Sequence, residues 1–171
     1  MVSGRPTPLD AMMENPMETP ADNPGVIVRP PLLYLAALLV MLSLRWLVPL
    51  PISHDSRVPW LGLLLIVPGV AIAIAGRRAL QAAGTNVNPS RPTTVVTSSG
   101  PYRFSRNPLY VSLTLMFLGL TLAANTWWGI VLLVPVLMLM HFGVVLREER
   151  YLDRKFGERY RQYRARVRRY V

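Results

Sequence analysis

Two short stretches carry the side chains that could do chemistry. The first runs from Gly100 to Tyr110 and places two prolines, two arginines and two tyrosines between apolar blocks. Each proline fixes its own φ and disfavours helix at the preceding residue, so Gly100 and Asn107 should be extended or turned, and Pro108 should open a helix. Such a rigid polar loop can hold a ligand. An ordinary interfacial loop is the alternative, because arginine and tyrosine collect at headgroup depth in membrane proteins.

The second stretch is Arg147-Glu148-Glu149-Arg150. A carboxylate offers several acceptor lone pairs and can take two hydrogen bonds from a diol such as a ribose. The alternative is local pairing of Glu149 with its neighbours, Arg150 or Asp153, on a solvated helix face, which stabilises little.

Four apolar blocks must position these stretches, and their long unbroken runs predict an all-α membrane protein. The third block has sixteen residues and rises only about 24 Å, against roughly 30 Å of hydrocarbon. We expect a kink at Pro68-Gly69 in the second block and a bend at Pro135 in the fourth. The expected membrane domain covers residues 31–171, with spans at about 31–48, 60–76, 109–124 and 127–146 and a ligand-binding loop at 77–108.

Composition narrows the remaining possibilities. Residues 1–30 are proline-rich with little apolar bulk, which predicts a disordered tail rather than a secretory signal. The chain has no cysteine, which excludes disulfides and thiolate chemistry, and its two histidines are too few for a convincing metal cluster. The net charge of +10 is unevenly distributed, and nucleic acid is not the expected partner.

The arginines predict the orientation in the membrane. The segment from Gly76 to Asn107 carries five arginines and no acid, and residues 147–171 carry ten basic residues against four acids. Both should lie on the cytoplasmic side, with the loop at 49–59 and the turn at Trp127-Trp128 outside. Both termini are then cytoplasmic. This pattern fits a prokaryotic inner membrane, with a eukaryotic reticulum as the alternative.

The basic C-terminal region, residues 147–171, is expected to form an amphipathic helix lying on anionic headgroups. Tyr160, Tyr163 and Val167 recur at helical spacing and would supply its apolar face. Phe156-Gly157 should end the preceding helix with glycine in the left-handed conformation. The arginines expected at the headgroups are Arg159, Arg161, Arg164, Arg166, Arg168 and Arg169.

Several of these motifs, in this order, resemble the isoprenylcysteine carboxyl methyltransferase and phospholipid N-methyltransferase superfamily. The resemblance covers about residues 76–171, and the superfamily pattern reads G-x-Y, R-H-P-x-Y-x-G and E-E. In that superfamily these segments surround S-adenosylmethionine at the cytoplasmic face, and the methyl acceptor arrives from the bilayer. The corresponding segments here are Gly100-Pro101-Tyr102, Arg106-Asn107-Pro108-Leu109-Tyr110-Val111, Glu148-Glu149, Leu152, Phe156-Gly157, Tyr160 and Tyr163.

The resemblance implies methyl transfer from S-adenosyl-L-methionine to a lipophilic acceptor that is prenylcysteine-like, a lipid or a small apolar molecule. It implies that Glu148 binds the diol or ammonium group of the cofactor, with Glu149 beside it, and that Arg106 binds the methionine carboxylate or only headgroups. The implied cofactor-binding residues are Val95, Val96, Tyr102, Arg106, Asn107, Pro108, Leu109, Tyr110, Glu148 and Glu149.

Three positions depart from the superfamily pattern. Its histidine is Asn107 here, which hydrogen-bonds but carries no charge near neutral pH. Its glycine after the tyrosine is Ser112, where a backbone approaches less closely. The arginine that holds the substrate carboxylate one turn before the glutamates is replaced by Val144, and Arg147 only partly shares that face.

The implied methyl transfer requires few catalytic groups from the protein. A sulfonium methyl group is already activated, so the protein has to align the acceptor and exclude water. An amine or thiol acceptor needs a base. The candidate is His141, seven residues before Glu148 and therefore on the same face of an α-helix, although a histidine hydrogen-bonded inside the bundle is the commoner arrangement.

Two other classes share the same hydropathy. Integral-membrane sterol reductases have a related C-terminal architecture and bind a nicotinamide cofactor, but normally have more than four spans. A non-enzymatic accessory protein would keep the spans and the basic tail but lose residues of the motifs. Asn107 and Ser112, which depart from the pattern, favour this class, whereas Tyr102 and the Glu148-Glu149 pair, which match it, argue against it.

Overall fold

A computed structural model describes residues 24–85 and 93–171, and all regular elements in these ranges are helices. The predicted all-α class is confirmed. The elements are α2 (Pro30–Leu47), α3 (Val58–Leu61), α4 (Leu63–Ala82), the 3₁₀ helix η1 (Gly100–Arg103), α5 (Pro108–Ala123), α6 (Trp128–Met138), the π-helical segment η2 (Leu139–Val145), α7 (Leu146–Phe156) and α8 (Glu158–Arg166).

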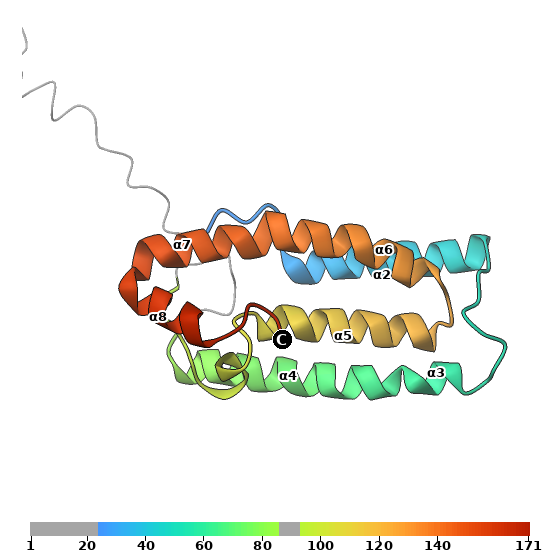
Figure 1. The fold of residues 1–171 in the computed structure, drawn as a ribbon. Coiled ribbons are helices and arrows are strands. Elements are labelled where there is room, and N and C mark those ends of the chain that lie inside the picture. The colour runs from blue at the N-terminus through green and yellow to red at the C-terminus, as the bar shows by residue number, and fades with distance from the viewer. Residues whose placement is uncertain (1–23, 86–92) are drawn as a thin grey trace, which may run out of the picture.

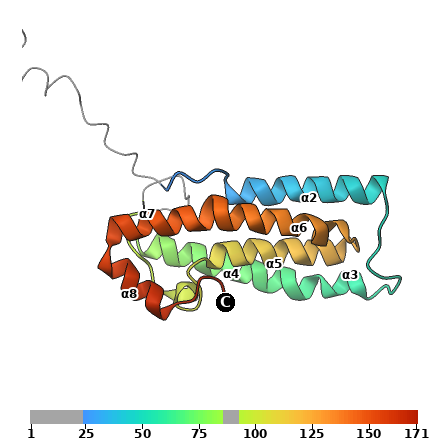
Figure 2. The same cartoon turned by 45° about the horizontal axis from the view of Figure 1, so that its top comes forward.

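The long helices lie side by side as a bundle (Figures 1 and 2). Helices α6, η2 and α7 follow one another as a single long rod, and α3 leads directly into α4. Helix α5 packs between α4 and α6, and α2 packs on α6. The hairpin α7–α8 and the 3₁₀ helix η1 gather at one end of the bundle, which we call the polar end.

Three helical stretches are long and apolar enough to cross a membrane, namely Pro30–Leu47, Val58–Ala82 and Trp128–Phe156, and α5 is a shorter apolar helix. Their outward side chains are apolar and exposed: Leu64 is 70% exposed, Val67 64% and Val134 59%. Such a surface is covered by lipid rather than by water. The predicted spans 31–48 and 109–124 lie within one residue of α2 and α5. The second helical stretch begins earlier than predicted, at Val58, and extends to Ala82, and the fourth extends beyond residue 146 to Phe156, so the span limits stay a prediction.

The two prolines expected to distort helices both lie inside helices. Pro68 lies inside α4, which runs unbroken from Leu63 to Ala82, and the kink expected there stays a prediction. Pro135 lies inside α6, and the helix departs from α geometry only at η2, four residues later. Hydrogen bonds in a π-helix run between residues i and i+5, which adds a residue to each turn and changes the direction of the side chains beyond it.

Small residues let the helices approach closely. A Cβ atom added to Gly129 of α6 would overlap the side chain of Thr121 in α5. Gly62 and Gly119 likewise bring the backbones before α4 and in α5 together, since a Cβ on either would overlap the other's carbonyl oxygen. Close contact between backbones replaces the hydrophobic driving force that helices lose in lipid.

The opposite end of the bundle is closed by hydrogen bonds between two loops. Asn125 Nδ2 donates to Ser53 O at 2.7 Å, and Trp128 Nε1 donates to Val48 O at 2.8 Å. These bonds tie the α2–α3 loop to the α5–α6 turn. The predicted turn at Trp127-Trp128 is therefore present and fixed in place.

The predicted tail, residues 1–30, lies mostly outside the described residues, which begin at Pro24. Residues 24–29 lie against η2 and α7: Ile27 N donates to Gly143 O at 3.2 Å, and Arg147 Nη1 donates to Gly25 O at 3.0 Å. Arg91 of the predicted loop also lies outside the described residues. The division of the chain at residue 30 stays a prediction.

Candidate functional site

A cavity of about 130 Å³ opens at the polar end of the bundle. Its walls come from α4, the loop before η1, the first turn of α5, α7 and α8, so segments far apart in sequence meet there. Nine of the ten residues implied as cofactor ligands line it: Val95, Val96, Tyr102, Arg106, Asn107, Leu109, Tyr110, Glu148 and Glu149. The tenth, Pro108, does not line it and begins α5. That these residues bind a cofactor stays a prediction.

The backbone of the Gly100–Tyr110 stretch is turned as its prolines predict. Gly100 has φ +56°, a conformation that only glycine adopts readily, and a Cβ there would contact Ala79 of α4 at 3.4 Å. Asn107 precedes α5 with φ −128° and ψ 49°, and Ser105 Oγ accepts a hydrogen bond from its N–H at 3.1 Å. These turns hold the loop between α4 and α8.

Glu148 is the carboxylate without a counter-charge. Its Oε1 accepts a hydrogen bond from Tyr110 Oη at 2.6 Å. Within the described ranges no arginine or lysine forms an ion pair with it, in contrast to Glu149. A carboxylate held in a cavity without a cation favours a cationic or hydroxyl-rich ligand group.

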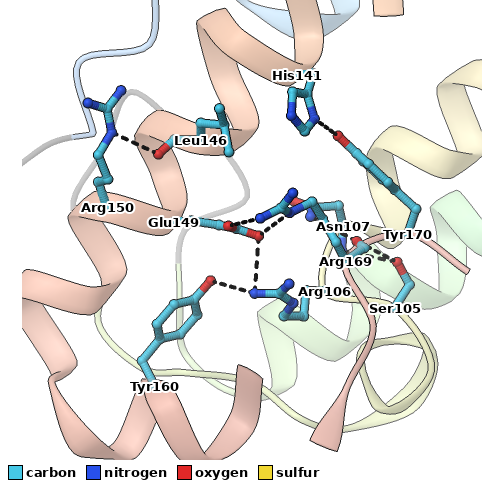
Figure 3. Close-up of polar contacts among 10 residues, drawn as sticks. All are labelled: Ser105, Arg106, Asn107, His141, Leu146, Glu149, Arg150, Tyr160, Arg169 and Tyr170. Atoms are coloured by element: carbon cyan, nitrogen blue, oxygen red, sulfur yellow. Dashed lines mark hydrogen bonds and ion pairs between the residues drawn. The ribbon is translucent and has the colours of Figure 1, made fainter. Parts of the chain in front are cut away.

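Glu149, its neighbour, is fully engaged (Figure 3). Arg169 donates to both of its oxygens, from Nε to Oε1 and from Nη2 to Oε2, each at 2.9 Å. Arg106 Nη1 lies 3.1 Å from Oε1. The suggested local pairing with Arg150 or Asp153 is wrong, because Arg150 bonds to Leu146 O and Asp153 pairs with Arg161.

Two buried polar atoms on the cavity wall have no hydrogen-bond partner in the described part of the chain, Thr97 Oγ1 and Arg106 Nε. Arg106 is held from the side by Glu149 and by Tyr160 Oη, the latter at 3.5 Å. Buried polar atoms are rarely left unpaired, so these two are candidate contacts for a polar ligand. Arg106 points inward, not toward headgroups.

Helix α8 contributes tyrosines to the site instead of an apolar face to the membrane. Tyr160 is 1% exposed, and Tyr163 Oη donates to Tyr102 O at 2.7 Å. Burial raises the pKa of both Tyr102 and Tyr163, with a further contribution from neighbouring groups, so both hydroxyls stay protonated at neutral pH. Two of the residues predicted to form the apolar face of this helix, Tyr160 and Tyr163, line the cavity, and the contact of its arginines with headgroups stays a prediction.

The turn between α7 and α8 aims these tyrosines. Gly157 ends α7 with φ +50° and ψ −124°. The predicted helix end with positive φ is confirmed, although ψ differs from that of a left-handed helical residue and belongs to a region nearly restricted to glycine. The chain therefore reverses direction sharply enough for α8 to return over the loop at residues 100–106 (Figure 1).

His141 does not reach the cavity. Its Nδ1 lies 2.8 Å from Tyr170 Oη, on an exposed side of the helix (Figure 3). The expectation that it shares a face with Glu148 assumed α geometry, whereas His141 lies within the π-helical segment η2, which shifts the helical phase before Glu148. The described residues contain no group of three His, Cys, Asp or Glu that could hold a metal ion.

The other departures also have structural counterparts. Val144 is completely buried in the bundle core, and Arg147 bonds to Gly25 O, so neither offers a cation to the cavity. The backbone of α5 at Ser112 still lies close to that of α4, because α4 has a glycine there. A Cβ on Gly69 of α4 would lie 3.1 Å from Ser112 O.

Thr97, which lines the cavity, and Arg169, which reaches the cavity through Glu149, were not predicted from the sequence as site residues. Thr97 lies outside the recognised motifs. Arg169 was counted among the arginines at the headgroups, and nothing in its sequence neighbourhood distinguishes it from Arg168. A buried carboxylate needs a cationic partner, and this need was the only indication in the sequence that an arginine would pair with Glu149. The sequence does not say which of the ten basic residues at 147–171 supplies it.

Comparison with known proteins identifies the family. Residues 58–159 match the model of the phospholipid methyltransferase family. The chain belongs to this family. Membership confirms the resemblance to membrane methyltransferases, and the matched region runs from α3 to the start of α8, including most of the cavity wall.

The chain is also similar to an uncharacterized protein of Haemophilus influenzae. It is 38% identical over 66 residues, which are 37% of this chain and the whole of that protein. No solved structure matches the chain. Arg169 lies beyond the region that the family shares.

Proposed function

We propose that this protein transfers the methyl group of S-adenosyl-L-methionine to a lipophilic acceptor at the cytoplasmic face of a membrane. The observation that carries the proposal is the pair of unmatched groups on one cavity wall: Glu148, a carboxylate without a cation, and Arg106, whose buried Nε lacks an acceptor. A ligand with both a cationic and an anionic group satisfies them together. The amino-acid part of S-adenosylmethionine carries such a pair.

The cavity residues fit the rest of this cofactor. Glu148 would hold the ammonium group or the ribose diol, and Arg106 the carboxylate through its free Nε. Thr97 offers an unpaired hydroxyl for a further polar atom. Val95, Val96 and Leu109 supply apolar surface for the adenine or the methionine chain.

S-adenosylmethionine would supply an activated methyl group on a sulfonium. The residues of this chain would bind and orient it, and the surrounding helices would exclude water. Tyr102 remains a neutral hydrogen-bonding side chain, and Tyr110 donates its hydroxyl to Glu148. No described side chain of the cavity is a histidine, so an acceptor that must lose a proton would rely on a carboxylate or on solvent.

The acceptor would arrive from the bilayer, because the cavity lies where the apolar helices meet the polar end. A prenylcysteine-like molecule, a lipid and a small apolar molecule all remain candidate acceptors. Val144 leaves no arginine at the position that would hold a substrate carboxylate. The exposed arginines of α8, together with Arg168, would contact anionic headgroups on the cytoplasmic side of a prokaryotic inner membrane.

Calorimetric titration of the purified full chain in detergent tests the proposal. We expect saturable binding of S-adenosylmethionine and S-adenosylhomocysteine, and loss of that binding in Glu148→Ala. Glu158→Ala is the matched control, because Glu158 is an exposed glutamate outside the cavity wall and should leave binding unchanged.

The remaining outcomes separate the other classes. Binding of NADPH alone would replace the proposal by a nicotinamide-dependent reductase. A folded protein that binds none of the three compounds would contradict the enzyme assignment and leave an accessory protein.

A further inference from the structure

A single carboxylate holds two arginines at the cavity. The Glu149 carboxylate contacts Arg106 from the loop before α5 and Arg169 from the segment after α8. The side chains of Arg106 and Glu149 are 9% and 10% exposed, so this cluster is largely shielded from water. Within this cluster two cations face one anion, so Arg106 can still bind an anionic ligand group, while Glu148 on the same wall has no cation of its own.

The two arginines use Glu149 differently. Arg169 takes both carboxylate oxygens with Nε and Nη2, which is the bidentate geometry that fixes a carboxylate most firmly. Arg106 is left with one contact, from Nη1 to Oε1, and its Nε stays unpaired. If Arg169 were absent, Glu149 could turn and take Arg106 through Nε and Nη2, the same side-on fork that Arg169 uses, and this contact would consume the free Nε.

Backbone contacts hold Arg169 in place. Ser105 and Arg168 form a parallel β-bridge, with Arg106 N donating to Arg168 O at 2.9 Å. Asn107 Nδ2 donates to Arg169 O at 3.0 Å (Figure 3). The segment after α8 is thereby paired with the loop that carries Arg106, and the position of Arg169 does not depend on its side chain alone.

We propose that Arg169 is a positioning residue: by binding Glu149 in a bidentate manner it keeps Arg106 Nε free for the carboxylate of the bound ligand. The proposal rests on the proposed function for the identity of that ligand. It goes beyond the family motifs, because Arg169 lies outside the matched region. It also assigns Asn107 a task, since this residue anchors the backbone at Arg169.

The test compares two probes on the full chain in detergent. S-adenosylhomocysteine carries the amino-acid carboxylate, whereas 5′-methylthioadenosine shares the nucleoside and sulfur but lacks it. In Arg169→Gln we expect the affinity for S-adenosylhomocysteine to fall about tenfold and that for 5′-methylthioadenosine to stay unchanged. Arg169→Lys keeps the charge but loses the fork and should fall between the wild type and Arg169→Gln.

Arg168→Gln is the matched control. It also removes one positive charge, but from the neighbouring residue, whose side chain is exposed. Equal weakening of both probes in Arg169→Gln would reduce Arg169 to a structural residue, and unchanged binding of both would overturn the proposal.

A second readout needs no cofactor. In protein labelled with ¹⁵N-arginine, the Arg106 Nε–H resonance, assigned with Arg106→Lys, should shift in Arg169→Gln as Glu149 takes this donor, and should not shift in Arg168→Gln. An unshifted resonance contradicts the positioning role. If the resonance shifts in Arg169→Gln while the wild-type protein binds neither probe, the proposed cofactor, and not the positioning role, is wrong.

Discussion

The adjacent glutamates of α7 are the same residue type but have different surroundings. Glu149 sits between two guanidinium groups, and Glu148 has a tyrosine hydroxyl as its partner. A carboxylate whose oxygens are already hydrogen-bonded inside the protein has few acceptor sites left for a ligand. A carboxylate without a cationic partner keeps most of its acceptor sites. At this scale we expect Glu149 to serve stability and Glu148 to serve binding.

Neutralising each glutamate separates these tasks. Glu149→Gln leaves a buried arginine without its counter-ion and should lower the free energy of unfolding by about 2–3 kcal/mol, less than for a fully buried pair because Arg169 is partly exposed. Glu148→Gln should change stability little. Thermal unfolding in detergent measures both, and a larger loss of Tm in Glu148→Gln would contradict the assignment.

Tyr110 orients Glu148 through a hydrogen bond of 2.6 Å. Tyr110→Phe removes this donor, and since a hydrogen bond to a charged group contributes about 1.5 kcal/mol, the affinity for S-adenosylhomocysteine should fall about tenfold. Titration calorimetry measures the change. Tyr170→Phe is the comparison, because the Tyr170 hydroxyl meets His141 outside the cavity wall, and an equal loss there would exclude a specific role for Tyr110.

Among the elements, α5 and α6 depend on the contact of Gly129 with Thr121. Gly129→Ala inserts a methyl group into the side chain of Thr121, which is completely buried and has no room to move, and should destabilise the fold by about 2–3 kcal/mol. Gly143→Ala is the control, because its Cβ would meet Ile27 at 3.5 Å, an ordinary contact. Comparable unfolding temperatures for the two variants would contradict the tight packing inferred here.

The apolar blocks and prolines were sufficient to place the helices, since the start of α5 at Pro108 and the helix end at Gly157 follow from local rules, but they did not predict that the second and fourth helical stretches continue to Ala82 and Phe156. They were not sufficient for η2, whose π geometry has no local sequence rule and moved His141 away from Glu148. Motif order predicted which loop and which helix meet at the cavity. The partner of Glu149 could not be predicted, because it depends on how the segment after α8 folds back.

For the whole molecule, the polar end and the α2–α3 loop lie at opposite ends of the bundle (Figure 1). Because the chain contains no cysteine, single cysteines report topology cleanly. We expect an impermeant maleimide to label Ser56→Cys in right-side-out membrane vesicles and Arg168→Cys only after permeabilisation. The opposite pattern would place the cavity outside the cell and overturn the cytoplasmic assignment.

Helix α5 has one consequence for the membrane around it. With 16 residues it rises only about 24 Å, and the cavity begins at its first turn. A helix shorter than the hydrocarbon core creates a hydrophobic mismatch, which a bilayer relieves by thinning locally. Headgroups near α5 would then sink toward the cavity, so the lipid itself would shorten the distance that an acceptor travels between the bilayer and the site.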